Sequence, residues 1–219
     1  MNNQDNPADG SIPLTPYPGD CQFTEFLRDR AFARHGGKTG PLSRQACLNR
    51  AKPIKLLLLD VDGVLTDGSI TYTHSGDEIK TFHCRDGFGI TMLQKIGVEV
   101  GLITARQSEA VARRAHDLKL THVFQGTRHK LTVLTSLMND LHLTPQEVAF
   151  MGDDWLDLAA LNQVGLAATV ADGMPELRPF VHFVAEHAGG RGAVRDLCDL
   201  IIEAKCRRQE LLTEYLTRQ

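Results

Sequence analysis

The stretch LLLLDVDGVLTDG, residues 56–68, places three aspartates and two glycines directly behind four leucines. A short, continuous apolar run predicts a strand that is buried on both faces, because a strand with one wet face would alternate apolar and polar residues. Carboxylates repel each other and bind water tightly. The crowding of Asp60, Asp62 and Asp67 at the end of such a strand therefore needs an explanation, which the rest of the sequence must supply.

The composition of the chain is that of a globular protein. It has 219 residues, is 42% hydrophobic and carries a formal net charge of -3, which gives no indication of nucleic-acid or membrane-surface binding. Its five cysteines form no CxxC pair, a pattern typical of reduced thiols in a cytoplasmic protein. The N-terminus lacks the basic start and apolar core of a secretory signal, and no apolar run approaches the ~20 residues that span a bilayer. We therefore expect a cytoplasmic location and no nucleic-acid or membrane partner.

The pattern along the chain predicts three parts. Residues 1–51 are expected to form an N-terminal extension, disordered over its first twenty residues and then carrying short helices at 21–35 and 42–51. Residues 52–206 are expected to form the main domain. Residues 207–219 are expected to form a helical tail, reached through one long closing helix over 191–216.

Strands and helices alternate through the main domain. Strands are predicted at 54–60, 98–104, 121–126, 147–154 and 166–170, and those at 54–60, 98–104 and 147–154 are expected to be buried. Helices are predicted at 86–97, 108–120, 129–143 and 155–165, and a β-hairpin at 69–83. Such alternation implies right-handed βαβ crossovers and a parallel sheet, so we expect an α/β fold of the Rossmann-like, three-layer sandwich type.

Polar side chains collect where three of these strands end. Asp60 and Asp62 follow the first strand, Thr104 and Arg106 follow the second, and the third runs into Asp153, Asp154 and Asp157. The carboxyl ends of parallel strands share one edge of a sheet, which is where ligands bind in such folds. Carboxylates converging there would repel each other unless a cation lay among them, and an oxygen-rich site suits Mg²⁺.

Four motifs in this order resemble those of the haloacid dehalogenase superfamily of phosphotransferases. DVDGV at 60–64 fits the first motif, Thr104 the second, Lys130 the third and GDDWLD at 152–157 the fourth. Alone, the two aspartates of the first motif are more often strand-end or capping residues, and a lone lysine is usually solvated. Their order along residues 54–205 favours the superfamily.

The resemblance implies roles for the residues of the first three motifs. Asp60 would attack phosphorus and become an aspartyl phosphate. Asp62 would protonate the leaving oxygen and then deprotonate the attacking water. Thr104 would donate a hydrogen bond to the phosphoryl group, and Lys130 would neutralise its charge and restrain Asp60.

The resemblance also implies a magnesium site. Asp60, Asp153 and the backbone carbonyl of Asp62 would bind Mg²⁺, while Asp154 and Asp157 would support the ion through its waters or through hydrogen bonds to its ligands. Asp157 has an equally ordinary explanation, because an aspartate in the first turn of a helix is favoured by the helix dipole.

The spacing of the motifs, together with further segments of the sequence, narrows the range of expected substrates. The short stretches between motifs leave no room for a cap domain, so the chain resembles the capless class, with a projecting hairpin. DVDGVLTDG, FHCRDGFGI, ITARQSEAV and AGGRGAVRDLCDLI resemble the sugar-acid phosphatases of the superfamily. The resemblance implies hydrolysis of 3-deoxy-D-manno-octulosonate 8-phosphate in lipopolysaccharide core biosynthesis. Besides Asp62 and Lys130, the positions implied to contact substrate are His83, Cys84, Arg85, Asp86, Gly87, Thr91, Arg106 and Arg114.

Two alternatives stay open at this point. One is a phosphatase of another sugar-acid phosphate, such as a nine-carbon acylneuraminate 9-phosphate. The other is a non-catalytic homologue that regulates a partner enzyme, which the complete set of Asp60, Asp62, Lys130 and Asp153 argues against. The resemblance further implies a homotetramer whose hairpins form its hub, with a neighbouring subunit covering each capless site. An isolated two-stranded hairpin is marginal in water, which fits this expectation.

Overall fold

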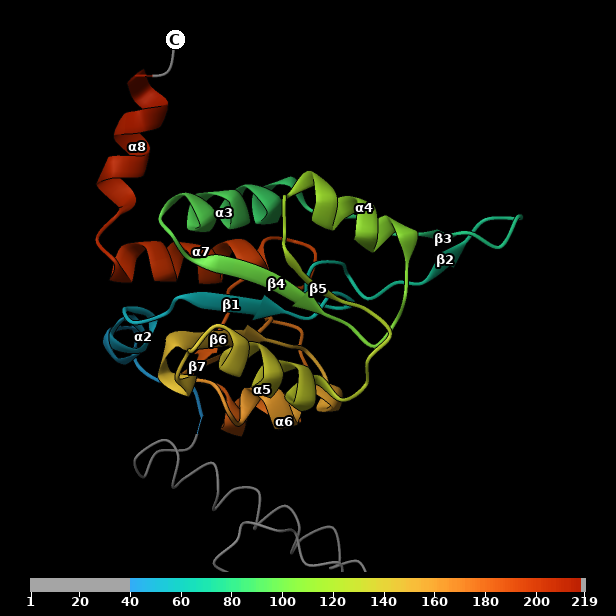
Figure 1. Cartoon of the computed structure of the whole chain (residues 1–219), viewed down its shortest axis with the longest axis horizontal. Coiled ribbons are helices and arrows are strands. Elements are labelled where there is room, and N and C mark those ends of the chain that lie inside the picture. Colours follow the sequence, from blue (N-terminus) through green and yellow to red (C-terminus); the bar gives the residue numbers. More distant parts are fainter. Residues whose placement is uncertain (1–39, 218–219) are drawn as a thin grey trace, which may run out of the picture. The chain divides into compact units, whose positions relative to one another are not determined.

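A computed structural model gives the structure of the chain and describes residues 40–217 (Figure 1). The disorder expected over residues 1–20 and the helix expected at 21–35 lie outside the described residues. The helices are α2 (Arg44–Ala51), α3 (Cys84–Lys95), α4 (Glu109–Asp117), α5 (Lys130–Asp140), α6 (Leu158–Leu161), α7 (Ala193–Ala204) and α8 (Arg208–Thr217), and the 3₁₀ turns are η1 (Pro145–Glu147), η2 (Trp155–Asp157) and η3 (Pro175–Phe180).

Six parallel strands form the central sheet in the order β5-β4-β1-β6-β7-β8. The strands are β1 (Leu56–Leu59), β4 (Glu99–Ile103), β5 (His122–Phe124), β6 (Val148–Met151), β7 (Leu166–Thr169) and β8 (Phe183–Val184). The chain first builds outward from β1 through β4 to β5, and then returns to add β6 on the other side of β1. This reversal makes the carboxyl end of β1 the place where a ligand site is expected in such a sheet.

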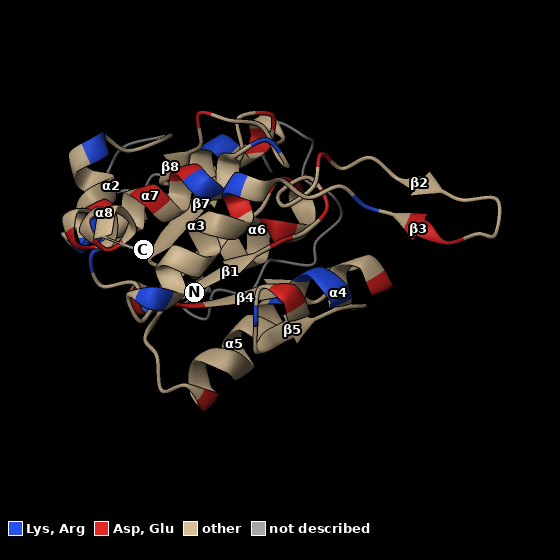
Figure 2. Cartoon of the chain, turned by 90° about the horizontal axis from the view of Figure 1, so that it is seen from above, with Lys and Arg blue, Asp and Glu red and all other residues tan. Residues whose placement is uncertain are grey.

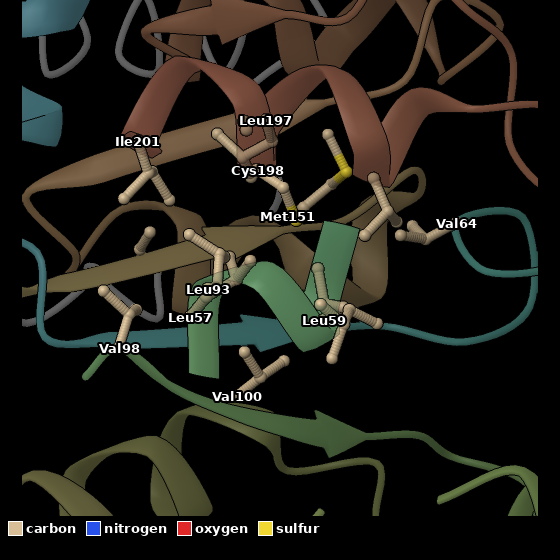
Figure 3. Packing of buried hydrophobic residues seen from close by; sticks show 14 of the residues in the cluster. Leu57, Leu59, Val64, Leu93, Val98, Val100, Met151, Leu197, Cys198 and Ile201 are labelled. Atoms are coloured by element: carbon tan, nitrogen blue, oxygen red, sulfur yellow. The ribbon is translucent and has the colours of Figure 1, made fainter. Parts of the chain in front are cut away.

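Helices cover both faces of the sheet, which gives three layers (Figure 1). Leu57 and Leu59 belong to the cluster that packs under α3 and α7 (Figure 3). Leu56 and Leu58 belong to the cluster on the face covered by α5 and α6. All four leucines are fully buried because successive strand residues point to opposite faces and both faces are covered. The predicted α/β three-layer fold is confirmed.

The single closing helix expected over residues 191–216 is wrong. The structure has two helices, α7 and α8, separated at Cys206, whose φ of 57° is left-handed. The backbone N–H of Cys206 donates to the carbonyl of Glu203, and that of Arg207 to the carbonyl of Ile202. These bonds satisfy the last carbonyls of α7 and end the helix, as a left-handed residue does at a helix C-terminus. The sequence prediction also missed β8.

Helix α2 contributes to the core. Ser43 caps it by accepting a hydrogen bond from the N–H of Ala46, and Cys47 and Ala51 are buried in the cluster that includes α7. Residues from Gly40 onward form one compact unit. The expected division at residues 51 and 206 stays a prediction, but this part of the expected extension shares the core of the main domain. The described cysteines, Cys47, Cys84, Cys198 and Cys206, are all free.

The predicted hairpin projects beyond the sheet (Figures 1 and 2). It consists of β2 (Thr71–Tyr72) and β3 (Glu78–Ile79), in which Tyr72 pairs with Glu78 and Thr71 with Ile79. Its apolar side chains are open to solvent in this chain: Ile70 is 51%, Tyr72 60% and Ile79 50% exposed. Within residues 40–217, each helix is too short or too polar to cross a membrane.

Candidate active site

Three carboxylates converge at the carboxyl edge of the sheet. Asp60 follows β1, Asp153 follows β6 and Asp157 ends the turn η2. One oxygen from each of these side chains lies within 4.8 Å of the others. Asp157 is fully buried and Asp60 is 7% exposed, so water screens their repulsion little. The structure thus brings together three of the five aspartates that the sequence placed at this edge.

Lys130 provides the positive charge of this acidic cluster. It is the first residue of α5, and its Nζ lies 2.8 Å from Oδ1 of Asp60 and 2.6 Å from Oδ1 of Asp157. Burial alone would lower the pKa of Lys130, but the charges of Asp157 and Asp60 outweigh burial and raise the pKa. The lysine therefore stays charged and ties α5 to the nucleophile expected at β1.

Asp157 acts as a brace within the cluster. Its Oδ1 accepts from Lys130, and its Oδ2 accepts from the backbone N–H groups of Asp153 and Asp154, at 3.0 and 3.2 Å. A Cβ at Gly152 would lie 2.3 Å from this carboxyl group, so only glycine leaves room for it. Because both oxygens of Asp157 already accept hydrogen bonds, its position favours the supporting role predicted for it over direct ligation.

Asp153 has a carboxylate oxygen that lacks a compensating contact in the described part of the chain. Its Oδ1 is buried and has no hydrogen-bond partner among the described residues. Burial first, and then the neighbouring carboxylates led by Asp60, raise the pKa of Asp153 to about 8. Burial and Asp157 likewise raise the pKa of Asp60 to about 6, against the opposing effect of Lys130. An unpartnered buried oxygen beside a second carboxylate fits a divalent cation with oxygen ligands.

Gly63 leaves room for the Asp153 side chain. Its φ is +87°, and a Cβ there would lie 2.1 Å from Oδ2 of Asp153. A side chain at position 63 would therefore displace Asp153 from the cluster. The glycine in DVDGV is thus explained by close approach as well as by its left-handed backbone.

The side chain of Asp62 lies in a second cluster. It pairs with Lys80, and its Oδ2 lies 3.9 Å from Nε of Arg106. Glu78 joins the same group, 3.0 Å from Nζ of Lys80 and 3.1 Å from Nη2 of Arg106. Nη2 of Arg106 also lies 3.2 Å from the hydroxyl of Tyr72. The hairpin therefore contacts the predicted acid–base residue directly.

Sequence reasoning missed Lys80 and Glu78. The one available signal was their spacing, because residues two apart in a strand share a face. A Lys and a Glu in a hairpin are common, so that spacing alone indicated no site.

Thr104 and Asp154 occupy the positions expected of them. Thr104 follows β4, is 2% exposed, and its hydroxyl accepts the backbone N–H of Arg106 at 3.3 Å. Asp154 is exposed and caps η2 by accepting the N–H of Trp155 at 2.6 Å. Their roles toward phosphate and metal stay predictions.

The residues around the RDG segment lie at the start of α3. Asp86 is 1% exposed, and its Oδ1 accepts the backbone N–H of Arg195 at 2.8 Å, which ties α3 to the first turn of α7. Burial raises the pKa of Asp86. A Cβ at Gly87 would lie 2.1 Å from Nη2 of Arg114, and that guanidinium lies 5.7 Å from the centre of the Phe82 ring. The glycine therefore leaves room for the arginine.

Other residues predicted to contact substrate surround this helix end. Nδ1 of His83 lies 4.0 Å from Oδ2 of Asp86, and within the described chain neither atom has a hydrogen-bond partner. Thr91 donates to the carbonyl of Gly87 at 3.0 Å, and Cys84 is exposed. Arg85 lines a cavity of about 360 Å³. The structure does not link these residues to the acidic cluster by any described hydrogen bond, so their contact with substrate stays a prediction.

Known proteins are similar in sequence to this chain over most of its length. A comparison with models of protein families found no match. The 3-deoxy-D-manno-octulosonate 8-phosphate phosphatase KdsC of Escherichia coli strain K12 is 42% identical over 171 residues, which cover 78% of this chain and 90% of the relative. The corresponding enzyme of Yersinia pestis is 43% identical over 166 residues, 76% of this chain and 88% of that protein. The chain belongs to this family of phosphatases.

Solved structures of the phosphatase family have the same fold. The phosphatase of Moraxella catarrhalis, crystallised with magnesium, phosphate and a KDO molecule, superposes with a TM-score of 0.76 at 37% identity, covering 77% of this chain and 97% of that one. The Yersinia pestis phosphatase gives a TM-score of 0.74 at 42% identity, covering 75% and 89%. Both agree with the three-layer fold described above.

Proposed function

We propose that this protein is a magnesium-dependent phosphatase that hydrolyses 3-deoxy-D-manno-octulosonate 8-phosphate to the free sugar acid and phosphate, in lipopolysaccharide core biosynthesis. The observation that supports this proposal is the acidic cluster of Asp60, Asp153 and Asp157 around Lys130. In a chain of this family, its carboxylates suit a cation and its lysine suits a phosphoryl group. The relative crystallised with magnesium, phosphate and KDO supports the same substrate.

In the first half of the reaction Asp60 is the nucleophile. Its carboxylate oxygen attacks phosphorus, the bond from phosphorus to the sugar oxygen breaks, and Asp62 gives that oxygen a proton. Lys130, fixed by Asp157, holds the Asp60 carboxylate and offsets the charge of the phosphoryl group. Thr104, at the end of β4, donates a hydrogen bond to a phosphoryl oxygen. Positioning and charge neutralisation of this kind are most of what phosphoryl transfer requires.

In the second half the aspartyl phosphate is hydrolysed. Asp62 takes a proton from water, the water oxygen attacks phosphorus, and the bond to Asp60 breaks to release phosphate. Asp60, Asp153 and the backbone carbonyl of Asp62 would hold Mg²⁺, and Asp157 and Asp154 would support them. When bound, the ion neutralises charge on the phosphoryl oxygens.

The substrate also carries a carboxylate, which arginines bind as planar forks. We assign its recognition to Arg106, Arg85 and Arg114, together with the start of α3 from His83 to Gly87. Thr91 supports this helix end through its bond to the carbonyl of Gly87.

A phosphate-release assay over a panel of sugar-acid phosphates tests the proposal. We expect highest kcat/KM on the eight-carbon 8-phosphate, loss of activity with EDTA and recovery with Mg²⁺. Ca²⁺ should inhibit, because its larger and looser coordination misplaces the nucleophile relative to phosphorus. Full activity without metal would contradict the mechanism. A higher kcat/KM on a nine-carbon 9-phosphate would contradict the proposed substrate and identify the nine-carbon compound instead.

We further propose that the enzyme acts in the cytoplasm as a homotetramer whose hairpins form the hub. The exposure of Ile70 and Ile79 on an isolated two-stranded hairpin supports this, because such a hairpin gains stability by pairing with copies of itself. A neighbouring subunit would then cover each capless site.

Replacing both Ile70 and Ile79 with Glu tests the assembly. Light scattering should give monomers or dimers with low turnover. Met174→Glu, which places the same charge at another half-exposed apolar residue outside the hairpin, should stay a tetramer. A wild-type monomer with full activity would rule the tetramer out.

A further inference from the structure

Lys80 is a buried lysine to which the mechanism above gives no task. It directly follows β3, and its side chain is only 1% exposed. Its Nζ donates to Oδ1 of Asp62 and lies 3.0 Å from Oε1 of Glu78. An ammonium group is costly to bury unless it is paired, so these two carboxylates account for its position.

The hairpin presents Lys80 to the site through the strand's alternation. Glu78 and Lys80 are two residues apart and point to the same face, where Glu78 also accepts from Arg106 at 3.1 Å. Ile79, between them, points to the opposite face and is half exposed. A chain of charges therefore runs from Asp62 through Lys80 and Glu78 to Arg106, and each link has an opposite charge on its neighbour.

The two oxygens of Asp62 have different surroundings. Oδ1 accepts the hydrogen bond from Lys80, whereas Oδ2 has Nε of Arg106 3.9 Å away, beyond hydrogen-bond distance. The ammonium group occupies the Oδ1 side of the carboxyl group as a donor, so the Oδ2 side is the one at which a proton can be given or taken.

We infer that Lys80 is a positioning residue for the acid–base step, an inference that rests on the proposed function. It fixes Oδ1 of Asp62 and so turns Oδ2 toward the reacting groups. Oδ2 gives its proton to the sugar oxygen as the bond from that oxygen to phosphorus breaks, and later takes one from the attacking water. Acid–base groups must be held within about 0.5 Å of their working position, which a buried, doubly paired lysine achieves.

An ordinary surface ion pair would look different. Lys55 also bonds a glutamate, Glu147, at 2.6 Å, but its side chain is 62% exposed and it lies at the other end of β1. Exposed pairs of that kind contribute little. Lys55→Met is therefore a matched control, because it removes a lysine that pairs with a carboxylate away from the site.

The leaving group provides the test. A sugar alkoxide needs a proton to leave, whereas 4-nitrophenolate leaves without one. We expect Lys80→Met to lower kcat/KM on the sugar-acid phosphate about tenfold, part of the ~10²–10⁴ that a general acid contributes. This ratio reports the step in which the sugar leaves and not the later hydrolysis of the aspartyl phosphate, which is common to all substrates. In kcat/KM on 4-nitrophenyl phosphate the same variant should lose less than about threefold. Lys80→Arg, which keeps a donor, should recover most of the activity, and Lys55→Met should match wild type on both substrates.

Equal losses of kcat/KM on both substrates would overturn the inference, since a purely structural role does not distinguish leaving groups. Unchanged kcat/KM on the sugar phosphate would overturn it as well. A wild-type enzyme inactive on the sugar-acid phosphate would contradict the proposed function alone, because variant and wild type can then be compared on another alkyl phosphate that the wild type hydrolyses.

Discussion

Two lysines in this protein each lie between two carboxylates, and the elements that carry them differ. Lys130 lies between Asp60 and Asp157 in the acidic cluster at the end of the central sheet. Lys80 lies between Asp62 and Glu78 at the base of the projecting hairpin. The first group is attached to β1, β6 and α5, which pack on the core, and the second to a hairpin with two residues in each strand.

The comparison separates what is rigid from what depends on the hairpin. Asp157 in the first cluster is fully buried, whereas Asp62 and Glu78 in the second retain 21% and 11% side-chain exposure. The proposed nucleophile is therefore held by the packed fold, while the proposed acid–base residue is held by a two-stranded segment outside the central sheet. We expect changes in the first cluster to affect both stability and chemistry, and changes in the second to affect chemistry with only a small effect on stability.

The largest effect is expected from Asp60→Asn. The amide is nearly isosteric but cannot attack phosphorus, so turnover should fall by more than about 10²-fold, or about 2.7 kcal/mol in the barrier. The thermal unfolding midpoint should not fall, because the substitution removes a charge that Asp157 and Asp153 repel. Phosphate release and thermal unfolding measure the two effects. A residual rate above about one hundredth of wild type would show that Asp60 is not the nucleophile.

Lys130→Met in the first cluster should destabilise the protein more than Lys80→Met in the second. Removing this cation leaves buried carboxylates uncompensated, which costs about 3–5 kcal/mol of unfolding free energy. Lys80→Met should cost only about 1 kcal/mol, because Asp62 and Glu78 keep contact with water. Urea unfolding of both variants without metal measures the difference. Equal losses would mean that the hairpin cluster is as firmly held as the sheet cluster.

The pH dependence of stability should have opposite signs in the two clusters. The pKa values of Asp60 and Asp153 are raised, to about 6 and about 8, so the folded protein binds protons more tightly there than the unfolded chain. Without metal, stability from these groups is present at low pH and lost as pH rises through both values. Burial would raise the pKa of Glu78, but Lys80 and Arg106 hold it below its ordinary value, so its contribution is lost as pH falls.

Thermal unfolding with EDTA between about pH 5 and about pH 8.5 checks this sign. Stability should fall by on the order of 5 kcal/mol as pH rises, and Mg²⁺ should restore it at the upper end. Asp153→Asn should flatten the dependence. Stability that rises with pH in this range without metal would contradict the prediction.

The smallest effect is expected from Tyr72→Phe. The hydroxyl lies 3.2 Å from Nη2 of Arg106 on a side chain that is 60% exposed, so its loss should cost at most about 0.5 kcal/mol. We expect about a twofold rise in KM for the sugar-acid phosphate and an unchanged unfolding midpoint. Steady-state kinetics measure it, and a fall in kcat of tenfold or more would mean that the hairpin positions the chemistry through Tyr72 as well.

Much of the fold and part of the site could be predicted from the sequence. The continuous run of Leu56–Leu59 predicted a buried central strand, and the order of strands and helices predicted the parallel sheet. Because parallel strands end at one edge, Asp60 and Asp153 could be placed together without coordinates. The break between α7 and α8 could not, since the left-handed backbone of Cys206 reflects local packing and helix ending that residue types there do not specify.

The functional site likewise has features that the sequence predicts and features that only the structure shows. The sequence alone determined which strand ends carry the carboxylates and that Lys130 begins a helix, because periodicity and motif order are properties of the chain. Only the tertiary structure decided that Asp157 is a brace with both oxygens bonded, and that Asp62 turns to Lys80. The reason is physical: hydrogen bonds and burial depend on which side chains meet in space, and Asp62 and Lys80 meet because the base of the hairpin lies beside the end of β1.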